Sequence, residues 1–222
     1  MKGFYVALCI MLFTLSVCMA EEQSGNARLS PDKIYLEYDL GLGLGMAVDC
    51  DTGRYWRTKG DFGFGVNMVY NASEHIRMRS GISGKAYYAS RLVTHPYAYV
   101  MNMDVHLSTY STQLLAMGEW VIPENEYNRE VFFGIGAYGD IIHVAEARIW
   151  QHYLTHTTFE KVNLKDSFPA ITPGVMVCVG AQLPVFRLEV RFTKDILTFD
   201  IPGNNTGKQR RSTIGLHFGF RP

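Results

Sequence analysis

Residues 34–48 read IYLEYDLGLGLGMAV and alternate strictly between apolar residues and residues of other kinds. The even positions carry isoleucine, leucine, tyrosine, methionine or valine, whereas the odd positions carry tyrosine, acidic residues, glycine or alanine. A period of two residues predicts a β-strand with two unlike faces. Such a strand, tilted by about 45°, rises about 35 Å, which exceeds the roughly 25 Å apolar band of a membrane-spanning barrel. This segment is therefore long enough to cross a membrane.

Further segments repeat this alternation and bring the predicted number of strands to eight. Their expected lipid-facing residues are Phe62, Phe64, Val66 and Met68; Ile76, Met78, Ile82 and Tyr88; Val131, Phe133, Ile135, Ala137 and Ile141; Ile171, Val175, Val177, Val179 and Leu183; Phe186, Leu188, Val190 and Phe192; and Ile214, Leu216, Phe218 and Phe220. Connections at residues 71–73, 123–128 and 183–185 are short and the others are longer, as in outer-membrane barrels. The predicted fold is all-β, an eight-stranded antiparallel up-and-down transmembrane β-barrel.

The fourth strand is the least regular of the eight. It is expected over residues 97–122, with Met101, Met103, Val105 and Leu107 on one face. The alternation breaks at residues 110–113, which indicates a β-bulge. A barrel of ten strands is the alternative, if residues 97–107 and 145–154 form extra strands.

The N-terminus has the features of a secretory signal. Lys2 precedes an apolar run over residues 4–17, and the small residues Cys18 and Ala20 flank Met19 before an acidic pair. The apolar run is shorter than the roughly 18 residues that a spanning helix needs. Residues 1–20 are therefore predicted to be a cleaved signal peptide, residues 21–32 a short periplasmic segment, and residues 33–222 the barrel of the outer membrane.

The charge balance argues against nucleic acid as a partner, and the positions of the cysteines argue against a disulfide. The chain has 21 basic and 21 acidic residues, so no basic excess exists to attract nucleic acid. Cys50 and Cys178 remain after signal cleavage and fall far apart on the strand map. A disulfide needs Cα atoms within about 7 Å, so both are expected to be free thiols.

Charged residues gather at inward positions in the periplasmic half of the predicted barrel. They are Glu37, Asp39, Arg77, Arg79, Glu119, Arg187, Glu189, Arg191, His217 and Arg221. An eight-stranded lumen is just wide enough to be filled by side chains, so these charges are expected to pair as a structural plug. A proton path or a catalytic cluster is the alternative. Higher in the barrel, inward glycines such as Gly41, Gly134 and Gly174 either open a small external vestibule or relieve strand curvature.

The predicted external loops are rich in aromatic residues and histidines. The candidate contact surface consists of Tyr55, Trp56, Trp150, His152, Tyr153 and His156. His152 and His156 have the spacing of two metal ligands on one helical face, but without a third ligand a surface for lipopolysaccharide or a protein is favoured. Arg54, Arg57 and Lys59 are candidates for contact with lipid phosphates. No metal, cofactor or catalytic residue is predicted, although an enzyme would have to bring His143, Glu146 and Ser167 together.

Three parts of the sequence resemble the outer-membrane β-barrel domain family of small porin-family or PorT-like proteins from Gram-negative bacteria. They are YSTQLLAMGEW at residues 110–120, VFFGIGAYGD at residues 131–140, and LEVRFTKDILTFD at residues 188–200 together with TIGLHFGFR at residues 213–221. The sequence differs from the family in having Gln113 in place of a usual proline and in ending with Arg221-Pro222. The resemblance implies a barrel in the outer membrane and leaves the activity open.

These observations favour a non-enzymatic envelope protein over an enzyme. The expected role is structural or partner-binding, with outer-membrane lipid, lipopolysaccharide and a protein partner as ligands. A subunit of a secretion or envelope-assembly machine is the specific form that the PorT-like resemblance allows. The alternatives are a lipid A-modifying enzyme and a small-solute pore, which a lumen crossed by ion pairs disfavours.

Overall fold

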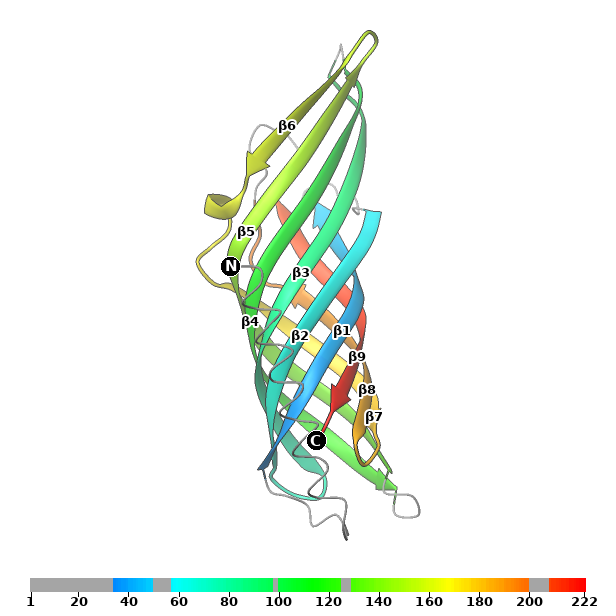
Figure 1. The fold of residues 1–222 in the computed structure, drawn as a ribbon, viewed down its shortest axis with the longest axis vertical. Helices are drawn as coiled ribbons and strands as arrows, with labels where there is room; N and C mark the ends of the chain where they lie inside the picture. Colours follow the sequence, from blue (N-terminus) through cyan, green and yellow to red (C-terminus); the bar gives the residue numbers. More distant parts are fainter. Residues whose placement is uncertain (1–33, 50–56, 98–99, 125–128, 200–207) are drawn as a thin grey trace.

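The computed structural model describes residues 34–49, 57–97, 100–124, 129–199 and 208–222 (Figure 1). The strands are β1 (Ile34–Asp49), β2 (Arg57–Asn71), β3 (Ile76–Tyr97), β4 (Val100–Glu124), β5 (Arg129–Tyr153), β6 (Thr157–Asn163), β7 (Thr172–Gln182), β8 (Phe186–Asp195) and β9 (Gln209–Phe220), with a short 3₁₀ helix, η1 (Lys165–Ser167). Within these ranges, no helix is long and apolar enough to span a membrane. The predicted signal peptide and periplasmic segment lie outside the described residues.

Eight of the strands close into a ring. Antiparallel pairing runs from β1 through β2, β3, β4, β5, β7, β8 and β9, and β9 pairs again with β1, for example at Leu216 and Leu42. The remaining strand, β6, lies outside the ring and pairs with residues 146–152 of β5. The predicted eight-stranded antiparallel barrel is therefore confirmed. The ten-strand alternative is wrong, because residues 100–107 and 145–153 are upper parts of the single strands β4 and β5, which pair with each other.

The outside of the ring is an apolar belt. Ile34, Leu36, Leu42, Ile82, Ile135, Val179, Phe186 and Leu216 are among its exposed side chains. Polar surface cannot face hydrocarbon, and closed barrels are one of the few folds that satisfy every backbone group there. On β4, Trp120 and Tyr110 are ten residues apart, about 25 Å along the barrel axis at a tilt of about 40°, and they bound the belt as aromatic girdles do. The belt thus has the height of a bilayer core.

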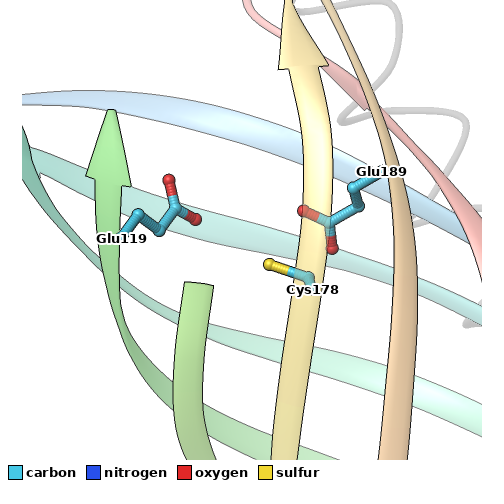
Figure 2. Close-up of side chains that lie close together, drawn as sticks. All are labelled: Glu119, Cys178 and Glu189. Carbon is cyan, nitrogen blue, oxygen red and sulfur yellow. The ribbon is translucent and has the colours of Figure 1, made fainter. Parts of the chain in front are cut away.

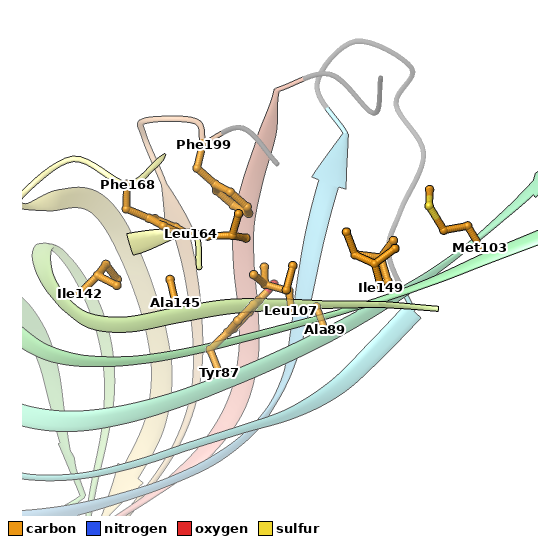
Figure 3. Close-up of a cluster of buried hydrophobic side chains, with 12 residues drawn as sticks. Tyr87, Ala89, Met103, Leu107, Ile142, Ala145, Ile149, Leu164, Phe168 and Phe199 are labelled. Atoms are coloured by element: carbon orange, nitrogen blue, oxygen red, sulfur yellow. The ribbon is translucent and has the colours of Figure 1, made fainter. Parts of the chain in front are cut away.

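Above the belt, β3, β4, β5 and β6 continue as a tall sheet beyond the ends of the other strands (Figure 1). Here the alternation is inverted, because Met103, Val105 and Leu107 of β4 point inward and are at most 3% exposed. They pack in one cluster with Phe168 and Phe199, which follow β6 and β8 (Figure 3). An apolar inner face and a polar outer face are what water requires, so this sheet is built for the aqueous side of the membrane.

A bulge lies where the sequence predicts one, at Tyr110 and Ser111, but its extra residue belongs to the neighbouring strand β5 and not to β4. β4 pairs with β3 without interruption from Ile76 to Thr94, and its inward alternation continues through residues 110–113. The register shift lies between β4 and β5, where Tyr110 faces Val144 and Ser111 faces Ile142. His143 on β5 is therefore the extra residue. The bulge lets Ile142 and Ala145 both point inward, which moves the apolar side of β5 from lipid to the inner cluster.

Candidate functional site

A layer of ion pairs fills the lower lumen. Glu119 on β4 accepts hydrogen bonds from both terminal nitrogens of Arg187 on β8, at 2.6 and 3.1 Å. Nε of Arg79 on β3 lies 3.1 Å from the same carboxylate. All three residues are at most 3% exposed. Because an unpaired buried charge is costly, the forked contact of Arg187 with Glu119 holds both side chains in a fixed position.

Glu189 connects three arginines within this layer. Its carboxylate accepts hydrogen bonds from Arg79 at 2.8 Å, from Arg187 at 2.9 Å and from Arg191 at 2.6 Å. On the inward face of β8, Glu189 therefore lies between Arg187 and Arg191 and binds both. The guanidinium of Arg187 also lies 3.6 Å from the ring centroid of Phe132, which contributes a cation–π contact.

Two further carboxylates tie the layer to β1. Asp39 accepts a hydrogen bond from Arg191 at 3.1 Å and lies 3.2 Å from Nδ1 of His217 on β9. Glu37 accepts a hydrogen bond from Arg79 at 3.3 Å. Strands that are distant in sequence are thus joined across the lumen by charge.

The structure brings together nine of the ten residues predicted for this network. Arg77 lies 3.7 Å from Glu119 and also pairs with Glu130, a partner that the sequence did not suggest. The tenth residue, Arg221, lies at the end of the chain with its guanidinium 4.2 Å from the ring centroid of Tyr35.

A second layer, which the sequence reasoning missed, fills the upper lumen. Arg211 on β9 donates to Asp195 at 2.7 Å and to Asp140 at 3.0 Å, and the hydroxyl of Tyr138 donates to Asp195 at 2.7 Å. The alternation in the sequence indicates that these residues point inward. It does not indicate at which height in the barrel the residues of β9 meet those of β5. A small cavity of about 20 Å³ lies in this layer, and Arg211 and Gln113 are among the residues that line it.

The inward glycines do not form a vestibule, because side chains of neighbouring strands occupy the space that they leave. A Cβ on Gly41 would collide with the imidazole of His217, and one on Gly174 would collide with the phenol of Tyr138. Both positions require glycine because an aromatic ring lies directly against the backbone. The open-vestibule hypothesis is therefore wrong for this part of the lumen, and the glycines serve its close packing.

Glu119, Cys178 and Glu189 place one potential ligand atom each within 4.8 Å of one another (Figure 2). Both carboxylates already hold arginines, since Arg187 binds Glu119 and Arg79 binds Glu189. The thiol of Cys178 donates to the sulfur of Met117 at 3.3 Å, and it is a free thiol as predicted. The arrangement is therefore a compensated ion network that offers a cation no excess negative charge. Cys50 lies outside the described residues.

Four of the six residues predicted for the aromatic contact surface, Trp150, His152, Tyr153 and His156, lie on the β5–β6 hairpin at the top of the tall sheet. Tyr153 and His156 stack with ring centroids 4.5 Å apart, and Trp150 packs against Phe159 at 5.2 Å. The helical interpretation of His152 is wrong, because it lies on a strand and its Nδ1 is 3.2 Å from Thr157 Oγ1. Tyr55, Trp56 and Arg54 lie outside the described residues, and nothing is described of the Arg57 side chain.

The residues named for an enzyme do not assemble into a catalytic triad. Nε2 of His143 lies 2.8 Å from Thr112 Oγ1, on the exposed side of the barrel. The carboxylate of Glu146 is paired with Lys161 at 2.7 Å. Ser167 is in η1, and in the described part of the chain no hydrogen bond joins its side chain to either residue.

Comparison with known proteins finds similar folds only. The sequence matches no protein-family model and no curated protein. Among solved structures, Ail, the attachment invasion locus protein of Yersinia pestis, has a TM-score of 0.40 and 16% identity over 86% of this chain and 99% of that chain. Neisserial surface protein A has a TM-score of 0.41 and 12% identity over 86% and 98%. The N-terminal β-barrel domain of Pseudomonas aeruginosa OprF has a TM-score of 0.31 and 7% identity over 83% of this chain and 97% of that chain.

These three are outer-membrane β-barrels, but their TM-scores are too low to assign a family or an activity to this chain. The barrel itself is established by the closed hydrogen-bond ladder of this chain. The resemblance to PorT-like proteins stays a prediction.

Proposed function

We propose that this chain is an integral protein of the Gram-negative outer membrane with a sealed lumen, and that its tall extracellular sheet binds a partner in the envelope. The observation that carries the proposal is the division of the barrel into two parts. The lower part is closed by ion pairs between Arg79, Arg187, Glu119 and Glu189. The upper part extends into water on β3 to β6 and ends in exposed aromatic and apolar side chains.

The β5–β6 hairpin is the best candidate for the contact. Leu154 at its tip is 82% exposed and Phe159 on β6 is 57% exposed, although both lie above the lipid belt. Large apolar side chains that gather in water mark interaction surfaces. In addition, β6 pairs with β5 along one edge only in the described structure, and an open strand edge can receive a strand from another chain. A protein partner thus fits this hairpin better than a small molecule.

Photo-crosslinking in the native membrane tests the proposal. A photoreactive phenylalanine analogue would replace Leu154 or Phe159, and Ile135, which is 63% exposed within the belt, would be the control position. We expect a protein adduct of one defined mass from positions 154 and 159, and lipid adducts alone from position 135. Identification of an envelope-machine component in the adduct would support the subunit role. Lipid adducts alone at all three positions would contradict partner binding.

A further inference from the structure

A row of basic side chains crosses the outer face of the sheet just above the belt. In the strand register, His106 of β4 faces Arg148 of β5, and Arg148 faces Lys161 of β6. Lys59 extends the row from β2, with its ammonium nitrogen 3.5 Å from Nδ1 of His106. His106, Arg148 and Lys161 are neighbours in the antiparallel ladder, so they project from the same face, the outside of the barrel. Lys59 lies at the register irregularity of β2 between residues 58 and 61, and it is exposed beside His106.

Such a row opposes folding unless something compensates for it. Like charges directly opposite each other on adjacent strands are destabilising. Lys161 is compensated by Glu146 at 2.7 Å, and the Asp104 carboxylate lies 3.8 Å from His152. Arg148, which is exposed, has no ion pair in the described part of the chain. Positive charge is therefore left over at Lys59 and Arg148.

The neighbouring cations also act on the imidazole of His106. Burial lowers the pKa of its imidazole below the ordinary value, and the charge of Lys59 lowers it further. Arg148 acts in the same direction, whereas Asp104 opposes the shift. A neutral imidazole between two cations still offers a hydrogen-bond donor to an anion.

The row borders a hollow of about 290 Å³ on the outer face, lined among others by Lys59, His106 and Arg148 above and by Tyr88 and Tyr110 below. Glu146 lines it too, but its carboxylate is paired with Lys161. The two tyrosine hydroxyls are 2.6 Å apart and mark the upper edge of the belt. Tyrosine girdles lie at the level of lipid headgroups, so a hollow directly above them faces the headgroup layer.

We propose that Lys59, His106 and Arg148 form a binding site for the phosphate of a glycolipid headgroup in the outer leaflet, the phosphorylated glucosamine of lipopolysaccharide. Arginine suits this ligand because its planar fork can bind two phosphate oxygens, and Lys59 adds a second charge. The tyrosines below would contact the start of the acyl chains. This inference rests on the membrane location proposed above, but it is independent of any protein partner.

The test uses the purified full-length barrel in detergent and measures binding of lipopolysaccharide by native mass spectrometry. Arg148→Gln and Lys59→Gln are each expected to weaken binding about tenfold, the contribution of one charge-assisted contact. Lys194→Gln on β8 is the matched control, because Lys194 is also an exposed outward cation but lies elsewhere in the ring. It should leave binding unchanged. Heat-modifiable migration in gels verifies that every variant forms the barrel.

Two further arms distinguish the source of the phosphate. Enzymatically dephosphorylated lipopolysaccharide should bind the unaltered protein about as weakly as intact lipopolysaccharide binds Arg148→Gln. Inorganic phosphate at millimolar concentration should not displace the lipid. Equal binding of phosphorylated and dephosphorylated lipid would overturn the proposal, as would an equal loss in Lys194→Gln. Displacement by inorganic phosphate would replace the lipid assignment with a site for the free anion.

Discussion

At the scale of single residues, the lumen is held by contacts in which each charge has its partner in place. Arg79 and Arg187 are at most 2% exposed and together contact Glu119 and Glu189. Replacing one member leaves the buried network with one charge that is not compensated. The position of each charge therefore matters more to stability than the number of charges.

Glu119→Gln should therefore destabilise the folded barrel by about 3–5 kcal/mol, because it removes one carboxylate charge from a buried network in which Arg79 and Arg187 both contact Glu119. Glu146→Gln is the matched control, since it breaks an exposed pair with Lys161 and should cost at most about 1 kcal/mol. Urea titration of the barrel refolded in lipid vesicles measures both free energies of unfolding. Similar losses in the two variants would show that the lumen pairs are not structural.

At the scale of the strands, one residue decides where lipid-facing surface becomes water-facing surface. His143 is the extra residue of β5 opposite Tyr110 and Ser111, and after it the buried positions become Ala145, Ala147 and Ile149. Without this residue, the polar side chains of the upper β5 would turn inward, because a shift of one residue exchanges the two faces of a strand.

Deletion of His143 is expected to expose the upper sheet to protease while the lower barrel still assembles, because every residue of the ion network lies on other strands or below the bulge. The control His143→Ala keeps the length of β5 and should remain resistant. Limited proteolysis of the detergent-folded protein, read by mass spectrometry, measures where cleavage occurs. Equal resistance of the two variants would show that the bulge does not set the inner face.

The strands that cross the belt could be predicted from sequence because lipid forces strict alternation on them. Outward residues such as Phe133, Val177 and Leu188 were identified in this way, and the structure exposes them. The orientation of the upper parts of β4 and β5 was not predicted. There the apolar residues of the alternating pattern point inward, as Val105 does, because the outer face meets water and not lipid. The layer around Arg211 was not predicted for another reason. The closing register of β9 against β1 and β8 fixes its depth, and no local pattern encodes that register.

At the scale of the whole molecule, the barrel combines a membrane part filled by ion pairs with a tall sheet that extends beyond the apolar belt. Two layers of ion pairs, centred on Glu119 and Arg211, leave a cavity of about 20 Å³ in the upper lumen. That space is comparable to a single water molecule, far below the width of an aqueous channel. The account therefore places the function on the outer surface, at the basic row and at the β5–β6 hairpin.

Planar-bilayer recording with the purified protein tests the sealed, membrane-spanning barrel most directly. Insertion is verified in vesicles of the same lipid by protection of the belt strands from protease. A lack of conductance then cannot be explained by a failure of the protein to insert. The account predicts no conductance steps from the inserted protein at physiological salt. Steady, reproducible conductance steps would contradict it, because ions could then cross the lumen past Arg187 and Glu119.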